Sequence, residues 1–444
     1  MELSTATLLS ISVASLAILV SLLSRKSAPS SKKRRPPGPR CLPFIGSLLH
    51  HLTSEPQVAL RDLAKKHGPV MYLRLGHVDT VVISSPAAAQ EVLRDNNLTF
   101  ASRPSLVATE ILCYGNTDIG FAPYGAYWRM LRKICTVEVL SARKVRQFAP
   151  IRDSEILSLV RNVRAAARGG EPVNLGGLLV SCANTISAKA TFGEGCDAEL
   201  QEQFLTAMGV AMEYSGGFCV GDLFPSLRFV DVVTRDMFTG GAETTSSAAE
   251  WIMSELMRYP EVKAKAQAEV RRTFDNKNPR DHESLIEELC YTRMVVKEGL
   301  RLHPVLPLLL PRVCRETCNV GGFEVTEGTR VMVNAWAIAR SAEHWHDAEE
   351  FRPERFVDST ARDYAGTRYE YLPFGSGRRM CPGGHFAMAT LELTVARLLY
   401  YFNWSLPNGI RPEELDMDMI VGATARRRNQ LHLIAEPYNV PIDL

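Results

Sequence analysis

The sequence predicts a mainly α-helical protein with a small β component and one membrane-spanning helix at its amino terminus. Most of the chain shows the three- to four-residue apolar repeat of helices, one short stretch alternates as strands do, and residues 3–23 carry no charge. The 444 residues are 46% hydrophobic and 23% charged, which is an ordinary globular composition. The chain is therefore long enough for one large domain.

The amino-terminal segment is long enough to cross a bilayer. Its 21 uncharged residues would span about 30 Å at about 1.5 Å per residue. Six Arg and Lys residues follow between positions 25 and 35, and such a cluster keeps the following domain in the cytosol. A cleaved signal peptide is the alternative, but its basic residues would precede the apolar run. We expect an anchor at 1–24, a basic, proline-rich linker at 25–47 and the globular domain at 48–444.

The expected elements of that domain are mostly helices. Residues 70–84 alternate around Gly76 and His77, which predicts a β-hairpin with a two-residue turn. Apolar periodicity predicts helices at 87–94, 127–137, 142–167, 173–190, 242–257, 262–274, 286–302 and 385–399.

Charge and cysteine spacing exclude several classes of function. A net charge of +2 gives no field for nucleic acid. The ten cysteines are scattered, and the one close pair, Cys314 and Cys318, does not have the spacing of a zinc site. This scatter is typical of small apolar residues in a reducing compartment rather than of a disulfide framework. No three histidines converge by spacing on a metal site.

The strongest chemical signal is residues 374–384, FGSGRRMCPGG, a glycine-rich loop directly before a predicted helix. A thiolate at such a place is stabilised by the helix N-terminus. A buried cysteine beside a tight turn is the alternative for the cysteine alone. The whole string F-x-x-G-x-R-x-C-x-G resembles the haem-binding loop of the cytochrome P450 superfamily. The resemblance implies haem b with Cys381 as the axial iron ligand, Arg379 on a propionate, and Phe374 and Gly383 beside the ligand.

Further motifs extend this resemblance along the chain. Glu298 and Arg301 are three residues apart and share a helix face, and with Arg355 of FRPERF they resemble the structural triad of the family. Taken alone, E-x-x-R indicates only a solvated ion pair. Trp128 and Arg132 in W-x-x-x-R resemble haem-propionate contacts, as does Arg312.

Residues 240–245, GGAETT, interrupt a helical pattern. Two glycines cost a helix about 1 kcal/mol each relative to alanine. A close helix crossing is the alternative explanation. In the family, the residues matching Glu243 and Thr244 relay protons to bound dioxygen. The threonine argues against the dioxygen-independent isomerases and dehydratases of the same fold, which commonly lack it.

The resemblance also implies the substrate and the partners. The expected pocket positions, 102–121, Ala242, Thr245, 305–310 and 420–424, are mostly apolar, which suits a lipophilic substrate. No dinucleotide fingerprint is present, so electrons would come from NADPH through NADPH-cytochrome P450 reductase. The amino-acid sequence as a whole resembles the plant A-type branch of the family, and within it a grass branch that oxidises diterpene olefins. We expect a monooxygenase that inserts one oxygen atom from dioxygen, anchored in the endoplasmic reticulum membrane with its catalytic domain cytosolic.

One region departs from the family. Between residues 222 and 245 the chain is too short to hold the two helices and the half-helix found there in relatives, with a join near Thr234 and Arg235. We therefore expect a P450 fold that is incomplete on its distal side, where helices shape the substrate chamber. An impaired or inactive truncated isoform that keeps the haem-ligand loop is the alternative to an active enzyme.

Overall fold

A computed structural model describes residues 35–48, 53, 55–193, 220–226, 244–357, 363–421 and 424–438. They form a helix-rich body with small sheets, which confirms the predicted mainly α class. The expected anchor at 1–24, the first part of the linker and the expected join near 234–235 lie outside these residues. Among the residues described, no helix is both long and apolar enough to cross a membrane.

The elements follow one another along the chain with few long connections. The α-helices are α2 (Pro56–His67), α3 (Pro86–Gln90), α4 (Val107–Leu112), α5 (Ala126–Lys133), α6 (Ala142–Gln147), α7 (Ala149–Ala166), α8 (Leu175–Phe192), α10 (Val220–Leu223), α11 (Thr244–Arg258), α12 (Pro260–Phe274), α13 (Cys290–Leu302), α14 (Ala335–Ile338) and α15 (Gly384–Tyr401). The strands are β1 (Val70–Leu75), β2 (Val78–Ile83), β3 (Val173–Asn174), β4 (Arg312–Val313), β5 (Cys318–Val320), β6 (Phe323–Val325), β7 (Arg330–Val333), β8 (Phe402–Ser405), β9 (Met419–Val421), β10 (Ala425–Arg427) and β11 (His432–Pro437).

Short π and 3-10 segments lie between or at the ends of these elements. The π segments are η2 (Glu91–Asp95) and η3 (Ile134–Val139). The 3-10 segments are η5 (Pro279–Glu288), η6 (Pro353–Phe356), η7 (Asp363–Ala365), η8 (Gly377–Arg379), η9 (Pro407–Gly409) and η10 (Pro412–Glu414).

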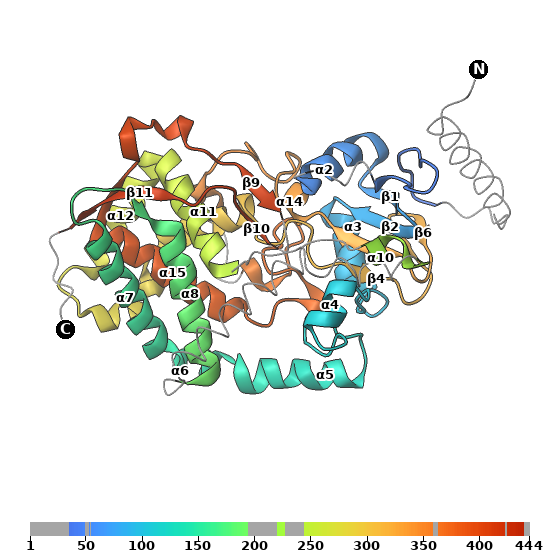
Figure 1. Cartoon of the computed structure of the whole chain (residues 1–444), viewed down its shortest axis with the longest axis horizontal. Coiled ribbons are helices and arrows are strands. Elements are labelled where there is room, and N and C mark those ends of the chain that lie inside the picture. Colours follow the sequence, from blue (N-terminus) through green and yellow to red (C-terminus); the bar gives the residue numbers. More distant parts are fainter. Residues whose placement is uncertain are drawn as a thin grey trace, which may run out of the picture.

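Helices and strands gather on different sides of the molecule. Figure 1 shows α7, α8, α11, α12 and α15 together on one side, while β1, β2 and α2 lie on the other. The largest sheet has the order β1-β2-β7-β4, with β2 and β7 parallel and the other pairs antiparallel. Helix α5 runs along the edge that joins the two sides (Figure 1).

The predicted hairpin is confirmed. Strands β1 and β2 pair antiparallel with Leu75 opposite Val78, which leaves Gly76 and His77 as the turn. Gly76 has a φ of +63°, a conformation that favours glycine. The turn is also held from outside, because the His77 N–H donates to the carbonyl of Leu223 at 2.8 Å.

Three of the predicted helices begin or break at other residues than predicted, and two others, 87–94 and 127–137, continue as the π segments η2 and η3. The helix predicted at 142–167 breaks at Phe148, because Pro150 starts a new helix at a position where its missing N–H costs nothing. The segment predicted as a helix from 286 is a 3-10 segment until Glu288. Helix α13 begins at Cys290, where the Glu269 carboxylate accepts from the N–H groups of Tyr291 and Thr292, both at 2.8 Å.

The third difference lies at residue 173. Val173 and Asn174 form strand β3 against β11 before α8 begins. The Asn174 side chain then caps α8 by accepting from the Gly177 N–H at 2.9 Å.

The largest core lies among the helices that carry the site. Helices α11, α13 and α15 pack together with α7, α8 and α12, and α15 is buried along most of its length. This core fixes the direction in which α15 starts, and the cysteine loop stands directly before it.

Candidate functional site

A mostly apolar cavity lies where the sequence motifs converge. It has a volume of about 420 Å³ and lies between the cysteine loop, α5, the start of α11 and the connection from α13 to β4. Cys381 lines one wall and Thr244 another, so one cavity joins segments that are 137 positions apart in the sequence.

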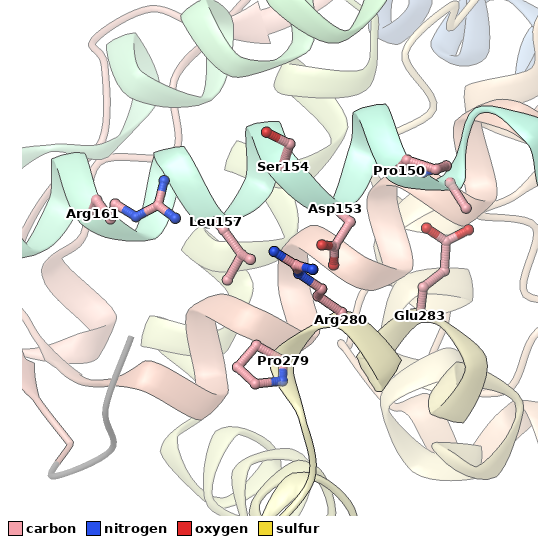
Figure 2. A pocket seen from close by; sticks show the side chains of 9 residues that line it. Pro150, Asp153, Ser154, Leu157, Arg161, Pro279, Arg280 and Glu283 are labelled. Carbon is pink, nitrogen blue, oxygen red and sulfur yellow. The ribbon is translucent and has the colours of Figure 1, made fainter. Parts of the chain in front are cut away.

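A second cavity, of about 440 Å³, lies between α7 and η5. Figure 2 shows Asp153 of α7 and Arg280 of η5 pointing toward each other across it. Its two carboxylates already have buried arginine partners, Arg397 for Asp153 and Arg152 for Glu283. Those ion pairs join α7 to the core, and the residues predicted for the functional site do not line this cavity.

The cysteine loop is shaped by glycine and closed by backbone hydrogen bonds. Gly377 has a φ of +70°, and a side chain there would collide with the carbonyl oxygen of Leu93. The Cys381 N–H donates to the carbonyl of Phe374 at 3.0 Å, which closes the loop just before α15. The Phe374 ring lies 3.5 Å from where a Cβ on Gly384 would be, which is an ordinary contact distance, so the ring packs against the start of the helix.

The Cys381 thiol faces the cavity. Its side chain is exposed by surface area because that surface is the cavity wall, although protein surrounds it on the other sides. Burial raises the pKa of the Cys381 thiol, while the Gly383 N–H and the Arg132 guanidinium act to lower it. A metal ion at the sulfur would reverse the balance, because coordination deprotonates a thiol.

Three buried guanidinium groups, those of Arg103, Arg312 and Arg379, line the same cavity. Within the described residues they donate to backbone carbonyl oxygens rather than to carboxylates. Arg312 donates to Phe100 and Ser376, at 3.3 and 3.2 Å. Arg379 donates to Ala101 at 2.6 Å and also to Ile119 and Ala122.

Burial disfavours the charge on each of these arginines. It lowers the pKa of Arg312 to about 9 and that of Arg379 to about 10, and the neighbouring positive charges act in the same direction. For Arg103 the pKa also falls well below its ordinary value, mainly through burial, and Asp118 opposes the shift. Three desolvated cations around one cavity, only partly offset by Asp118 near Arg103 and Arg379, favour the binding of an anion there.

The residues present therefore fit haem. Its two propionates would supply the negative charge that the arginines lack, its iron would find a sulfur ligand in Cys381, and its ring would contact the apolar walls. This agreement concerns the chemistry of the donor groups around one cavity.

Arg103 lies in the expected pocket segment 102–121, but it was not predicted as one of the charged contacts of the site. Its Nη1 donates to the carbonyls of Leu310 and Pro311 at 2.7 and 2.9 Å, and its Nε donates to Gly120 at 3.0 Å. It thereby ties three segments of the cavity wall together. A sequence signal was available, because this arginine stands directly before a proline in FASRPS.

The predicted W-x-x-x-R pair lies at the cavity on α5. The buried Trp128 indole donates to the carbonyl of Ile119 at 3.0 Å, and the Arg379 guanidinium lies 4.2 Å from the centre of its ring. Arg132 donates to the carbonyl of Met380, next to Cys381. The structure thus brings Trp128, Arg132 and Arg379 together.

The predicted triad also comes together, away from the cavity. Glu298 accepts from Arg301 at 2.7 and 2.9 Å and from Arg355 at 2.9 Å, and the carboxylate is fully buried. Arg301 also donates to the carbonyls of Ala339 and Ala348, at 2.7 and 2.8 Å. The triad joins α13 to the loop around η6 and satisfies its buried charges through many hydrogen bonds.

The distal wall is described only in part. Thr244 and Thr245 begin α11 and line the cavity, while Glu243 and Ala242 lie outside the described residues. Of the expected pocket segments, 305–310 supplies Val305, Leu306, Leu309 and Leu310 to the wall. From 102–121, Arg103, Ile119 and Gly120 line it. Ile420 and Thr424, from the expected segment 420–424, do not line it.

Comparison with known proteins agrees with this geometry. The sequence model of the cytochrome P450 family matches residues 36–232 and 230–432. The chain is 60% identical to a 9-beta-pimara-7,15-diene oxidase of Oryza sativa subsp. japonica, with 99% of both chains covered. It is 56% identical to cytochrome P450 CYP99A1 of Sorghum bicolor, with 96% of this chain and 98% of the relative covered.

A solved structure shares the fold. A zebra fish cytochrome P450 solved with progesterone superposes with a TM-score of 0.71 at 24% identity, covering 86% of this chain and 99% of that one.

The chain belongs to the cytochrome P450 family of monooxygenases. Its similarity to rice and sorghum members, one of them named as a diene oxidase, confirms the resemblance to a grass branch that oxidises diterpenes. Membership implies haem iron, electrons supplied by a reductase, dioxygen and a lipophilic substrate.

The alignment also bears on the irregular region. The match to the rice oxidase spans 499 positions, whereas this chain has 444 residues, so at least 55 positions, the difference between the two, have no counterpart here. The family match likewise divides at 230–232, beside the expected join at 234–235. The division of the family match falls beside the place where the sequence predicts a missing segment, whereas the alignment length shows only that positions are missing from the chain.

Proposed function

We propose that this chain is a haem b monooxygenase that inserts one oxygen atom from dioxygen into a diterpene olefin. The observation that carries the proposal is one cavity with a cysteine sulfur on one wall, buried arginines on its rim and an otherwise apolar lining. Electrons would come from NADPH through a separate reductase. The expected anchor at 1–24 would hold the domain on the cytosolic face of the endoplasmic reticulum membrane.

Haem bound in this cavity would supply the activation of dioxygen, and the residues of the chain would hold and shield it. Cys381 would give the sulfur ligand, and Gly383 and Phe374 would lie beside it at the start of α15. Arg312, Arg379 and Arg132 would hold the propionates.

The remaining roles concern protons and water. The Thr244 hydroxyl, at the start of α11, lies on the cavity wall where it could pass a proton inward, and we assign the adjoining carboxylate role to Glu243. The side chains of Val305, Leu306, Leu309 and Leu310 present an apolar surface that would bind a hydrocarbon and exclude water.

The test is turnover in isotopically labelled dioxygen. The full chain, co-expressed with a P450 reductase in microsomes, would be given NADPH and a panel of diterpene olefins, and products would be weighed by mass spectrometry. We expect a product that carries one labelled oxygen atom. An unlabelled, rearranged product would favour the isomerase or dehydratase alternative. Bound haem with no product from any olefin would favour the impaired isoform.

A further inference from the structure

Two cysteines that the haem site does not use lie side by side at the edge of the sheet region. Cys314 follows β4, and Cys318 opens β5. Both flank one residue of β6, because Cys318 pairs with Val325 across the ladder and the Cys314 Sγ lies 3.7 Å from the Val325 carbonyl oxygen. The two thiols are hydrogen-bonded to each other.

The two thiols have different surroundings. Cys314 is fully buried, whereas Cys318 is partly exposed. The hydrogen bond between them raises the pKa of Cys314 and lowers that of Cys318, because the Cys314 thiol donates to the Cys318 sulfur. An oxidant in solution can therefore reach the partly exposed Cys318 sulfur, whereas the buried Cys314 sulfur is shielded from it.

We propose that Cys314 and Cys318 form a reversible disulfide when the protein meets hydrogen peroxide. The Cys318 thiolate attacks one peroxide oxygen, the O–O bond breaks, and the released hydroxide takes a proton to leave as water. Cys318 is then a sulfenic acid. The Cys314 sulfur attacks it and loses its proton, the S–O bond breaks, and the S–S bond forms with release of a second water. Two thiols are oxidised by two electrons, and one peroxide is reduced to two waters.

The surroundings indicate a labile bond rather than a structural one. The disulfide would close a loop of only five residues, so it would constrain the unfolded chain little. The position of Cys314 is already fixed without it, since its N–H donates to the Thr329 carbonyl at 2.9 Å and its carbonyl accepts from Gly328 at 2.8 Å. A reductant such as a dithiol would restore both thiols.

The chain offers a direct measurement, because Arg315 lies between the two cysteines. Trypsin would cut after Arg312, Arg315 and Arg330, leaving peptides 313–315 and 316–330 joined only by the disulfide. Full-length protein in microsomes would be treated with hydrogen peroxide, alkylated, digested without reduction and analysed by mass spectrometry. We expect the joined peptide to increase at least about tenfold and to disappear after dithiothreitol. Both cysteines alkylated at peroxide levels that oxidise the exposed Cys41 and Cys290 would overturn the proposal.

Variants distinguish the role of Cys318, which attacks the peroxide, from that of Cys314, which closes the disulfide. In Cys314→Ser, oxidation should stop at a sulfenic acid on Cys318 that dimedone traps, whereas Cys318→Ser should leave Cys314 unlabelled. Cys290→Ser, an exposed cysteine elsewhere, is the matched control and should leave the joined peptide unchanged. Dimedone on Cys314 in the unmodified sequence would contradict the assigned order of attack. The peptide map of that sequence tests the linkage even if a variant fails to fold.

Discussion

Helices α15 and α5 border the same cavity, but they differ in how their apolar residues are covered. Helix α15 buries an unbroken run from 390 to 401, inside the core formed with α11 and α13. Helix α5 and the following η3 bury Trp128, yet they expose an apolar stripe on another face, formed by Tyr127, Met130, Ile134 and Val137, which are 43% to 52% exposed. A stripe that repeats every three or four residues is normally covered by another element.

The difference separates a region with a packed core from one with an exposed apolar stripe. Around α15 and α13 the apolar residues lie in one buried core, and the ion pairs of Glu298 on α13 are buried and hydrogen-bonded. On α5 and η3 the stripe is bare, in a chain that lacks at least 55 positions of the alignment to the rice oxidase. We expect the side that carries the cysteine loop to be intact and the loss to concern packing elsewhere. Four substitutions or restorations test this.

The largest effect should come from Cys381→Ala. Removal of the sulfur should abolish the thiolate-type spectrum of the reduced, carbon monoxide-bound protein completely, because no other described cysteine lines the cavity. The measurement is the difference spectrum of microsomes. Cys290→Ser, at an exposed position, is the control and should keep the spectrum. A spectrum that survives in Cys381→Ala would refute the assignment of the ligand.

The next effect tests the packing beside α13. Glu298→Ala would leave Arg301 and Arg355 buried without their carboxylate, and it should lower the free energy of unfolding by about 3–5 kcal/mol. The matched control is Arg352→Ala, whose side chain is exposed and lies 3.5 Å from Asp347, with an expected change within about 0.5 kcal/mol. Denaturant unfolding followed by tryptophan fluorescence measures both. Equal effects would show that the triad does not stabilise this side.

A smaller effect is expected from restoring the segment that the sequence predicts to be missing. A chain that receives the corresponding residues of the rice relative at the join near 234–235 should form about tenfold more product per haem, because a closed chamber excludes water from the reaction. Haem content should change much less. Product and haem are measured together with reductase present. Equal turnover per haem in the two forms would show that the segment is dispensable.

The smallest effect is expected on the stripe of α5 and η3. Met130→Lys and Val137→Lys should change the free energy of unfolding by no more than about 0.5 kcal/mol and should lower aggregation, because these side chains already face solvent. Leu393→Lys on α15 is the contrast, and it should prevent folding, because it buries a charge without a partner. A loss above about 2 kcal/mol from the stripe variants would mean that the stripe is covered after all.

Most of the structural features that the sequence predicted correctly depend on residues that are close together in the chain. The hairpin at 70–84 follows from alternation and a two-residue turn, and the start of α15 follows from the glycine-rich loop before it. The helix predicted from 286 was too long because its start depends on Glu269, a residue of the preceding helix that caps α13. The residues around the start of α13 therefore do not reveal where that helix begins, because the capping carboxylate comes from another helix.

The sequence by itself determined the family and the helix face shared by Glu298 and Arg301, and it predicted Cys381 as the iron ligand, because these depend on residues close together in the chain. Only the tertiary structure decided that Arg103 joins Arg312 and Arg379 around one cavity, and that the Cys314 and Cys318 thiols are hydrogen-bonded. The physical reason is how far apart in the sequence the interacting residues lie. A helix or turn brings near neighbours together by its own geometry, whereas buried cations and paired thiols meet only after strands and helices distant in sequence have packed.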